Sequence, residues 1–204
     1  MFCTNCGSKL SDTAKFCSNC GAPRYVYPVA PVGNKIDFST FKKCDYQYDY
    51  SHYGNIKISD GGVIKEISVE LCPDDDEKIA DSSKEALQFF VDNYDKYREI
   101  YQHALYEYYQ ELRSTLGYDN IEAAEEDSFP YVTTFEDFLE TVEFTGMIVH
   151  DDKKDGKHAI GLYFDATWEE EHGAGVLMAG FEVLDTGNFD HAHYTYALSK
   201  NRDN

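Results

Sequence analysis

Four cysteines near the start of the chain have the types and spacing of a metal site. Cys3 and Cys6 are separated by two residues, as are Cys17 and Cys20, and ten residues lie between the pairs. A glycine follows each pair and tolerates the positive φ of a tight turn around a metal. Four thiolates suit one tetrahedral zinc ion and leave no position open for a substrate or an activated water. The sequence therefore predicts one structural Zn²⁺ held by Cys3, Cys6, Cys17 and Cys20.

Two other chemistries could use the same cysteine pairs. Two disulfides would suit a secreted domain, and a redox-active pair would suit a thioredoxin-like βαβ setting. Neither a secretory signal nor such a setting is visible around Cys3, so zinc is the preferred interpretation. A segment of about 22 residues cannot bury a useful core. Metal binding would supply its folding free energy, on the order of 10 kcal/mol.

Residues 1–24 resemble the short bacterial zinc-ribbon module, whose pattern is F-C-x-x-C-G-x-x-L, a spacer, and F-C-x-x-C-G. The resemblance implies a structural zinc and a recognition or interaction role. We expect the ribbon to span residues 1–22. Three prolines then favour an extended spacer over residues 23–35. An acidic domain is expected over residues 36–204.

A second group of residues could do chemistry in the large domain. Its members are Trp168, Glu171, His172, His191 and His193. In one interpretation Glu171 or Glu170 acts as a base beside His172, with Trp168 as the wall of a site. In the other the stretch is a structural corner, where Trp168 fills the core and the acids face water. Both interpretations remain open.

The His191-x-His193 pair offers a further option. On a strand, residues two apart point to the same face, so both imidazoles could share a metal. With His172, or one of the acids near it, they would make three ligands and leave an open zinc position, as in a hydrolytic site.

Residues 168–176 carry the pattern W-x-x-E-H-G-x-G-V. The chain from about 36 to 190 resembles a bacterial domain family of unknown function with that signature near its C-terminal hairpin and a helical middle. The resemblance implies a protein-interaction or immunity-type role and supplies no catalytic residue. The matching positions are Trp168, Glu171, His172, Gly173, Gly175 and Val176.

The first elements that must position these residues are a hairpin and several helices. Apolar alternation on both sides of Gly61 and Gly62 predicts two strands joined by a tight turn. Ser82 begins a capping-box pattern for one helix. A second helix is expected from Tyr94 to Leu116, with an apolar and tyrosine-rich stripe. Thr134 is expected to cap a third, short helix.

After the helices, the spacing of apolar residues returns to every second position, as in a strand. Phe144, Gly146 and Ile148 are expected on one face of a strand, followed by strands near 160–164, 175–178 and 181–184. Residues 185–188 are expected to form a turn. This order predicts an α+β domain with an antiparallel sheet and a central helical segment.

Charge is distributed unevenly along the chain. The formal net charge is −20, and residues 1–35 carry +3, so residues 36–204 carry −23. Such a domain repels phosphate backbones, and direct nucleic-acid binding is not expected. It could steer a basic protein partner, although a solvated surface without a special partner fits equally well. No apolar run reaches membrane-spanning length, so we expect a cytoplasmic protein without a membrane segment.

Together these features predict a zinc-binding protein of unknown specific function, with a non-catalytic role in protein interaction, an immunity-type role included. The alternative is a small metal-dependent hydrolase that uses Glu171, His172, His191 and His193. A second bound metal would separate the two hypotheses.

Overall fold

The computed structural model describes residues 35–44, 51–73, 78–126 and 129–198. The four ribbon cysteines and the linker prolines lie outside these residues. Apart from residue 35, the described residues belong to the predicted acidic domain, and the predicted boundaries of the ribbon and linker stay predictions. No helix in the described ranges is long and apolar enough to cross a membrane.

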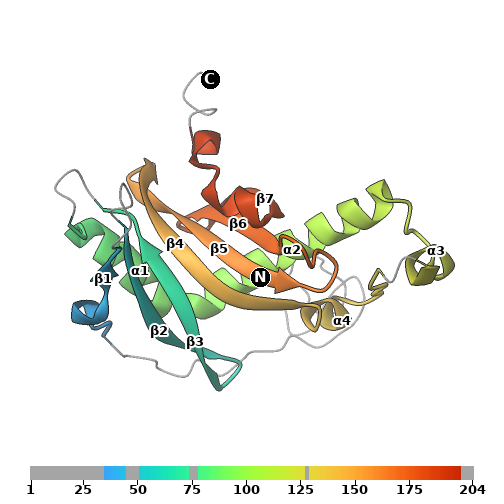
Figure 1. Cartoon of the computed structure of the whole chain (residues 1–204), viewed down its shortest axis with the longest axis horizontal. Coiled ribbons are helices and arrows are strands. Elements are labelled where there is room, and N and C mark those ends of the chain that lie inside the picture. The colour runs from blue at the N-terminus through green and yellow to red at the C-terminus, as the bar shows by residue number, and fades with distance from the viewer. Residues whose placement is uncertain (1–34, 45–50, 74–77, 127–128, 199–204) are drawn as a thin grey trace, which may run out of the picture.

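One sheet organises the described part of the chain, and its strands lie side by side in sequence order (Figure 1). They are β1 (Lys42–Lys43), β2 (His52–Asp60), β3 (Val63–Leu71), β4 (Val142–Lys154), β5 (Lys157–Ala166), β6 (Ala174–Ala179) and β7 (Glu182–Asn188). Every neighbouring pair is antiparallel except β3 and β4, which are parallel. The expectation of an antiparallel sheet was wrong at this pair, because the chain crosses back over the sheet before β4 begins.

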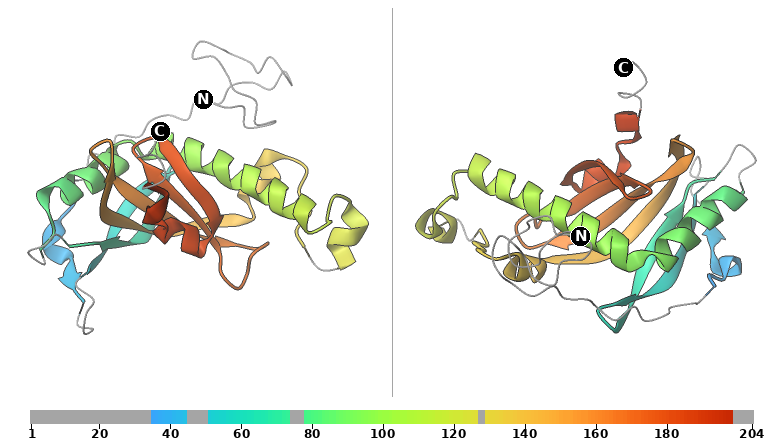
Figure 2. Two further views of the ribbon diagram at one scale, coloured as in Figure 1. Left: turned by 90° about the horizontal axis from the view of Figure 1, so that it is seen from above. Right: turned by 180° about the vertical axis from the view of Figure 1, so that it is seen from behind.

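Helices make that crossing. They are α1 (Asp81–Asp92), α2 (Tyr94–Thr115), α3 (Ile121–Glu126) and α4 (Phe135–Leu139). Three short 3₁₀ helices complete the described elements: η1 (Phe38–Thr40), η2 (Phe189–His193) and η3 (Thr195–Leu198). Helices α1 and α2 cover one face of the sheet (Figure 2). The opposite face of β5 and β6 is covered by η2, so both strands are buried on both sides.

The predicted stripe of α2 forms much of the core. Tyr97, Tyr101 and Leu105 are 1%, 3% and 0% exposed. Burying one side chain of this size stabilises the fold by roughly 1.5–3 kcal/mol. Gly117 follows the helix with a φ of +84°, which confirms it as the stop, since only glycine adopts this conformation without strain.

The predicted β2–β3 hairpin is also confirmed. Asp60 pairs with Val63, and Gly61 and Gly62 have φ values of +59° and +87°. A two-residue turn with positive φ at both positions matches the right-handed twist of the strands. The guanidinium of Arg98 donates a 2.6 Å hydrogen bond to Asp60 and so ties the hairpin to α2.

The capping prediction for α1 was wrong. The helix begins at Asp81 after Ala80, which makes no side-chain cap. Ser82 lies inside the first turn, and its Oγ is 2.9 Å from Nε2 of His158. The residue that looked like a cap thus connects α1 to β5.

Two strand predictions also need correction. Phe144 pairs with Phe164, but Gly146 pairs with Tyr163, so Thr145 is an extra residue in β4. This bulge moves Gly146 to the face opposite Phe144, because side chains alternate along a strand. The expected turn at 185–188 is instead part of β7, and the chain turns earlier, between β6 and β7.

Candidate functional site

Trp168 occupies a corner between β5 and β6. Its side chain is 6% exposed and packs against the rings of Tyr108, Tyr109 and Phe138, with centroids 5.7, 5.8 and 6.4 Å away. Its indole Nε1 is buried and has no hydrogen-bond partner among the described residues. These contacts place Trp168 in the core, as the structural-corner interpretation expected.

The neighbouring acid and histidine face solvent. Glu171 and His172 are both exposed, and Nδ1 of His172 lies 3.3 Å from a carboxylate oxygen of Glu169. The expected Glu171–His172 partnership is therefore replaced by a Glu169–His172 contact. Gly173 has a φ of +63°, and a Cβ there would lie 2.5 Å from the Phe164 carbonyl oxygen. The glycine is required because the loop bends sharply against β5.

The two C-terminal histidines lie in the 3₁₀ helix η2 and not on a strand. His191 approaches a carboxylate oxygen of Asp185 at 3.1 Å, while the ring of His193 stacks on Tyr163 at 5.4 Å. A 3₁₀ helix has three residues per turn, so side chains two residues apart diverge. In the described ranges, no group of three or more His, Cys, Asp or Glu could hold a metal ion. The hydrolase hypothesis therefore finds no ligand set there.

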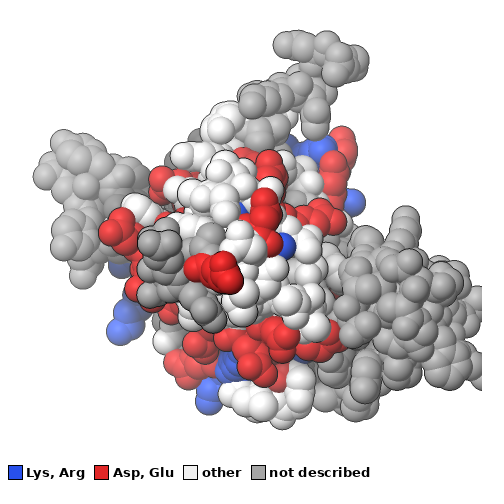
Figure 3. Space-filling view, turned by 90° about the vertical axis from the view of Figure 1, so that its right-hand side faces the viewer, with Lys and Arg blue, Asp and Glu red and all other residues white. Residues whose placement is uncertain are grey.

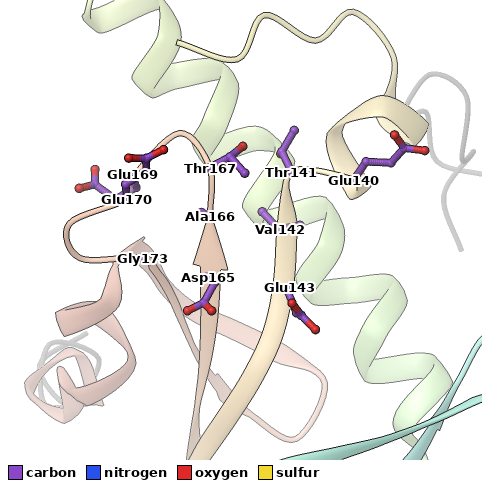
Figure 4. A pocket seen from close by; sticks show the side chains of 10 residues that line it. All are labelled: Glu140, Thr141, Val142, Glu143, Asp165, Ala166, Thr167, Glu169, Glu170 and Gly173. Atoms are coloured by element: carbon purple, nitrogen blue, oxygen red, sulfur yellow. The ribbon is translucent and has the colours of Figure 1, made fainter. Parts of the chain in front are cut away.

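The structure assembles a different feature, which the motifs did not reveal. Acidic side chains gather on the side of the molecule where β4 begins and β5 ends (Figure 3). A pocket of about 370 Å³ opens there (Figure 4). The loop between β5 and β6, which carries the W-x-x-E-H-G-x-G-V pattern, forms one wall. The carboxylates of the pocket are Glu140, Glu143, Asp165, Glu169 and Glu170, and among the residues that the structure describes no Lys or Arg lines it.

Two of these carboxylates come from paired positions on neighbouring strands. Glu143 on β4 and Asp165 on β5 are cross-strand partners, and both are exposed. In Figure 4 their carboxylates point away from each other. Each therefore adds its negative charge separately to this side of the molecule.

A second pocket, of about 320 Å³, lies between α2 and β7. Its lining residues are Ile100, His103, Ala104, Glu107, Tyr108, Glu111, Val183 and Thr186. Ile100, Ala104 and Val183 give it apolar surface, and its described lining includes two carboxylates and no Lys or Arg. His103 is 7% exposed and stacks on Phe135, and burial lowers its pKa to about 4.

Tyr108 lines the second pocket and is also influenced by an acid of the first. Burial raises the pKa of its hydroxyl, and the carboxylates of Glu169 and Glu111 raise it further. Because Glu169 lines the first pocket and Glu111 the second, the tyrosine lies in the negative field of both. We call the seven carboxylates of the two pockets the acidic track: Glu107, Glu111, Glu140, Glu143, Asp165, Glu169 and Glu170.

Comparison with known families accounts for the N-terminal cysteines. A family model described as a zinc-ribbon domain matches residues 2–24, which include Cys3, Cys6, Cys17 and Cys20. Four thiolates in two closely spaced pairs fit a closed tetrahedral zinc site. The match indicates that the chain binds zinc, and these ligands would give the metal a structural role.

A second family model covers most of the chain. Its description is "Domain of unknown function (DUF6985)", and it matches residues 40–194. No curated protein and no solved structure matches the chain. The chain therefore belongs to the DUF6985 family and carries a zinc-ribbon domain ahead of the DUF6985 domain.

Proposed function

We propose that this zinc-binding protein has a non-catalytic role and binds a basic segment of a protein partner along the acidic track. One observation carries the proposal: seven carboxylates line two pockets, each pocket supplies an acid that raises the pKa of Tyr108, and no Lys or Arg among the described residues lines either pocket. Carboxylates on a folded surface usually alternate with cations. Here they concentrate where the surface is hollowed.

Electrostatics favours a basic ligand at this place. A unit charge about 4 Å from a carboxylate gains roughly 1 kcal/mol in water and about 4 kcal/mol at the effective dielectric constant of a protein surface. Several such contacts would steer a basic partner and hold it in register.

The same charges argue against some other partners. Phosphate backbones are repelled by the track, so we expect no direct binding to DNA or RNA. The zinc ribbon would serve as a second docking module. A cytoplasmic location is part of the proposal, since reduced thiols suit a zinc site. An immunity-type role in bacteria would be one specific form of such a partnership.

The test is binding of a fluorescent octa-arginine peptide to the full chain, measured by anisotropy. The site variant combines Glu143→Gln with Asp165→Asn. The matched control combines Glu85→Gln with Asp152→Asn, two exposed carboxylates outside both pockets. Both variants change the net charge equally, so that a difference between them reports position and not total charge.

We expect the site variant to weaken binding by at least ~10-fold at about 0.05 M salt, and the control by less than ~2-fold. Equal weakening by the two variants would mean that the peptide follows overall charge, and would refute the proposal. Duplex DNA of similar length serves as the second ligand. Tight binding of DNA to the full chain would also contradict it.

A further inference from the structure

A serine and a histidine meet where α1 lies against β4 and β5. Ser82 belongs to the first turn of α1, and its Oγ is 2.9 Å from Nε2 of His158 on β5. The other ring nitrogen of His158, Nδ1, is 2.7 Å from the backbone carbonyl oxygen of His150. The imidazole is held at both nitrogens, so its orientation toward Ser82 is fixed.

These two contacts also determine where the protons lie. A carbonyl oxygen can only accept, so Nδ1 of His158 carries the hydrogen and donates it to His150. Nε2 of the neutral ring is then an acceptor, and the hydroxyl of Ser82 donates to it. Burial lowers the pKa of His158, and the charge of Lys153 also lowers it, so the neutral form prevails near pH 7. A neutral imidazole in this position is a general base for the hydroxyl.

An irregularity in β4 makes the carbonyl of His150 available. The register between β4 and β5 shifts between Val149 and Lys153, and such a bulge interrupts the ladder of backbone hydrogen bonds. Lys153 then pairs with His158 across the strands, and its Nζ lies 3.4 Å from the Oγ of Ser82. An ammonium group at this place favours negative charge that develops on the oxygen.

The serine can be reached from solvent, although the groups around it are buried. Ser82 is half-buried, whereas Ser83 and His158 are 0% and 5% exposed. The amides of Ser83 and Lys84 donate to the carbonyl of Ala80, and within the described residues the amide of Ser82 has no backbone acceptor. An unpaired N–H on the nucleophilic residue itself can bind the oxygen on which charge develops, as in an oxyanion hole.

We propose that Ser82 is a nucleophile that accepts a carboxylic acyl group from an activated acyl donor, with His158 as its general base. The Oγ attacks the carbonyl carbon, an Oγ–C bond forms, and the bond from that carbon to the leaving group breaks. Nε2 of His158 takes the hydroxyl proton and returns it to the leaving group. This step modifies the chain and needs no turnover. It goes beyond the proposed function and does not depend on the acidic track.

The test must separate this chemistry from the structural role of a contact between α1 and β5. The full chain is incubated with a fluorophosphonate probe, whose phosphorus takes the place of the acyl carbon. The Oγ–P bond forms, the P–F bond breaks, and fluoride leaves. Fragmentation of the labelled peptides in a mass spectrometer then identifies the modified residue. We expect an adduct on Ser82 and none on Ser83, and this map of the wild type needs no variant.

Three variants identify the groups that act. His158→Gln keeps a neutral polar side chain but removes the base, and we expect it to slow labelling by at least ~100-fold. Ser82→Ala should abolish labelling. Ser83→Ala is the matched control, because the hydroxyl of Ser83 is buried and has no hydrogen-bond partner among the described residues. It should be labelled as fast as the wild type, and circular dichroism shows whether each variant folds.

Acyl transfer itself is measured with 4-nitrophenyl acetate. We expect a burst of about one equivalent of 4-nitrophenolate per chain in the wild type and no burst in Ser82→Ala. The inference is overturned by any one of three results: no adduct on Ser82, equal labelling rates in wild type and His158→Gln, or no burst.

The outcome is independent of the proposed function. The combined variant Glu143→Gln and Asp165→Asn should be labelled as fast as the wild type, whatever its affinity for octa-arginine. Steady release of 4-nitrophenolate after the burst would support Ser82 as the acceptor and would contradict the non-catalytic role. Loss of octa-arginine binding with labelling retained would remove the acidic track alone.

Discussion

Acid should unfold the large domain partly through His103 on α2. This side chain is 7% exposed and stacks on Phe135 with centroids 4.4 Å apart. Burial is the main cause that lowers its pKa from 6.5 to about 4. The folded state therefore resists protonation that the unfolded chain accepts. A depressed histidine pKa gives stability that is present above about pH 6.5 and lost as the pH falls toward 4.

The magnitude follows from the two pKa values. Between about pH 8 and pH 5, the unfolded histidine becomes almost fully protonated while the folded one stays mostly neutral. The linkage relation then gives a loss of about 2 kcal/mol in the free energy of unfolding from this residue. Burial also lowers the pKa values of His150 and His158. They add to the loss in the same direction.

The variant His103→Phe isolates the contribution. It keeps an aromatic ring against Phe135 and removes the titration. Urea unfolding followed by far-ultraviolet circular dichroism, at several pH values, gives the free energy for each protein. We expect the loss between about pH 8 and pH 5 to be about 2 kcal/mol smaller in the variant than in the wild type.

Two features of the design keep the result interpretable. Acid also releases zinc from cysteine sites, but this contribution is common to both proteins and cancels in the difference. His172→Phe makes the same replacement at a side chain that is 60% exposed. It should leave the pH dependence as in the wild type. Identical pH dependence in wild type and His103→Phe would refute the reasoning.

Three other predictions follow from the chain. Metal analysis of purified protein should find one zinc per chain, lost in Cys3→Ser and retained in His172→Ala; a second metal that disappears with His172→Ala would favour the hydrolase hypothesis instead. Gly161→Ala places a Cβ against the carbonyl oxygen of Ala192, and urea unfolding should show a loss of about 1–3 kcal/mol; an unchanged midpoint would mean that η2 moves freely. Trp168→Ala should cost about 3–5 kcal/mol and Trp168→Phe clearly less; equal costs would mean that ring packing is not what Trp168 supplies.

Several local patterns in the sequence predicted local structure, although the Ser82 cap and the turn at residues 185–188 were wrong. The turn at Gly61 and Gly62 depends on the backbone freedom of two adjacent glycines. The buried stripe of α2 depends on a spacing that can be counted along the chain. Thr134 accepts a hydrogen bond from the Asp137 amide and so caps α4 as predicted. In each case the residues that decide the outcome are within a few positions of one another.

Pairings between strands that are distant in the sequence could not be predicted from local patterns. Nothing near β3 or β4 shows that they lie parallel, because the crossover helices set their direction. The bulge at Thr145 became visible only through its partners on β5. For the same reason, Glu143 and Asp165 looked like unrelated surface acids. The predicted site residues were found by motif, whereas the acidic track depends on register.

The parallel pairing of β3 with β4 has a consequence for synthesis of the chain. The strand β3 ends at Leu71, and β4 begins at Val142, so the ribosome must add about 70 residues before the partner strand exists. At 5–20 residues per second, that takes on the order of 4–14 s. During this time the hairpin of β2 and β3 can form, but one edge of β3 has no neighbour. Nascent chains should therefore be most prone to aggregate while the helices are being made, and a chaperone that shields strand edges would act in that interval.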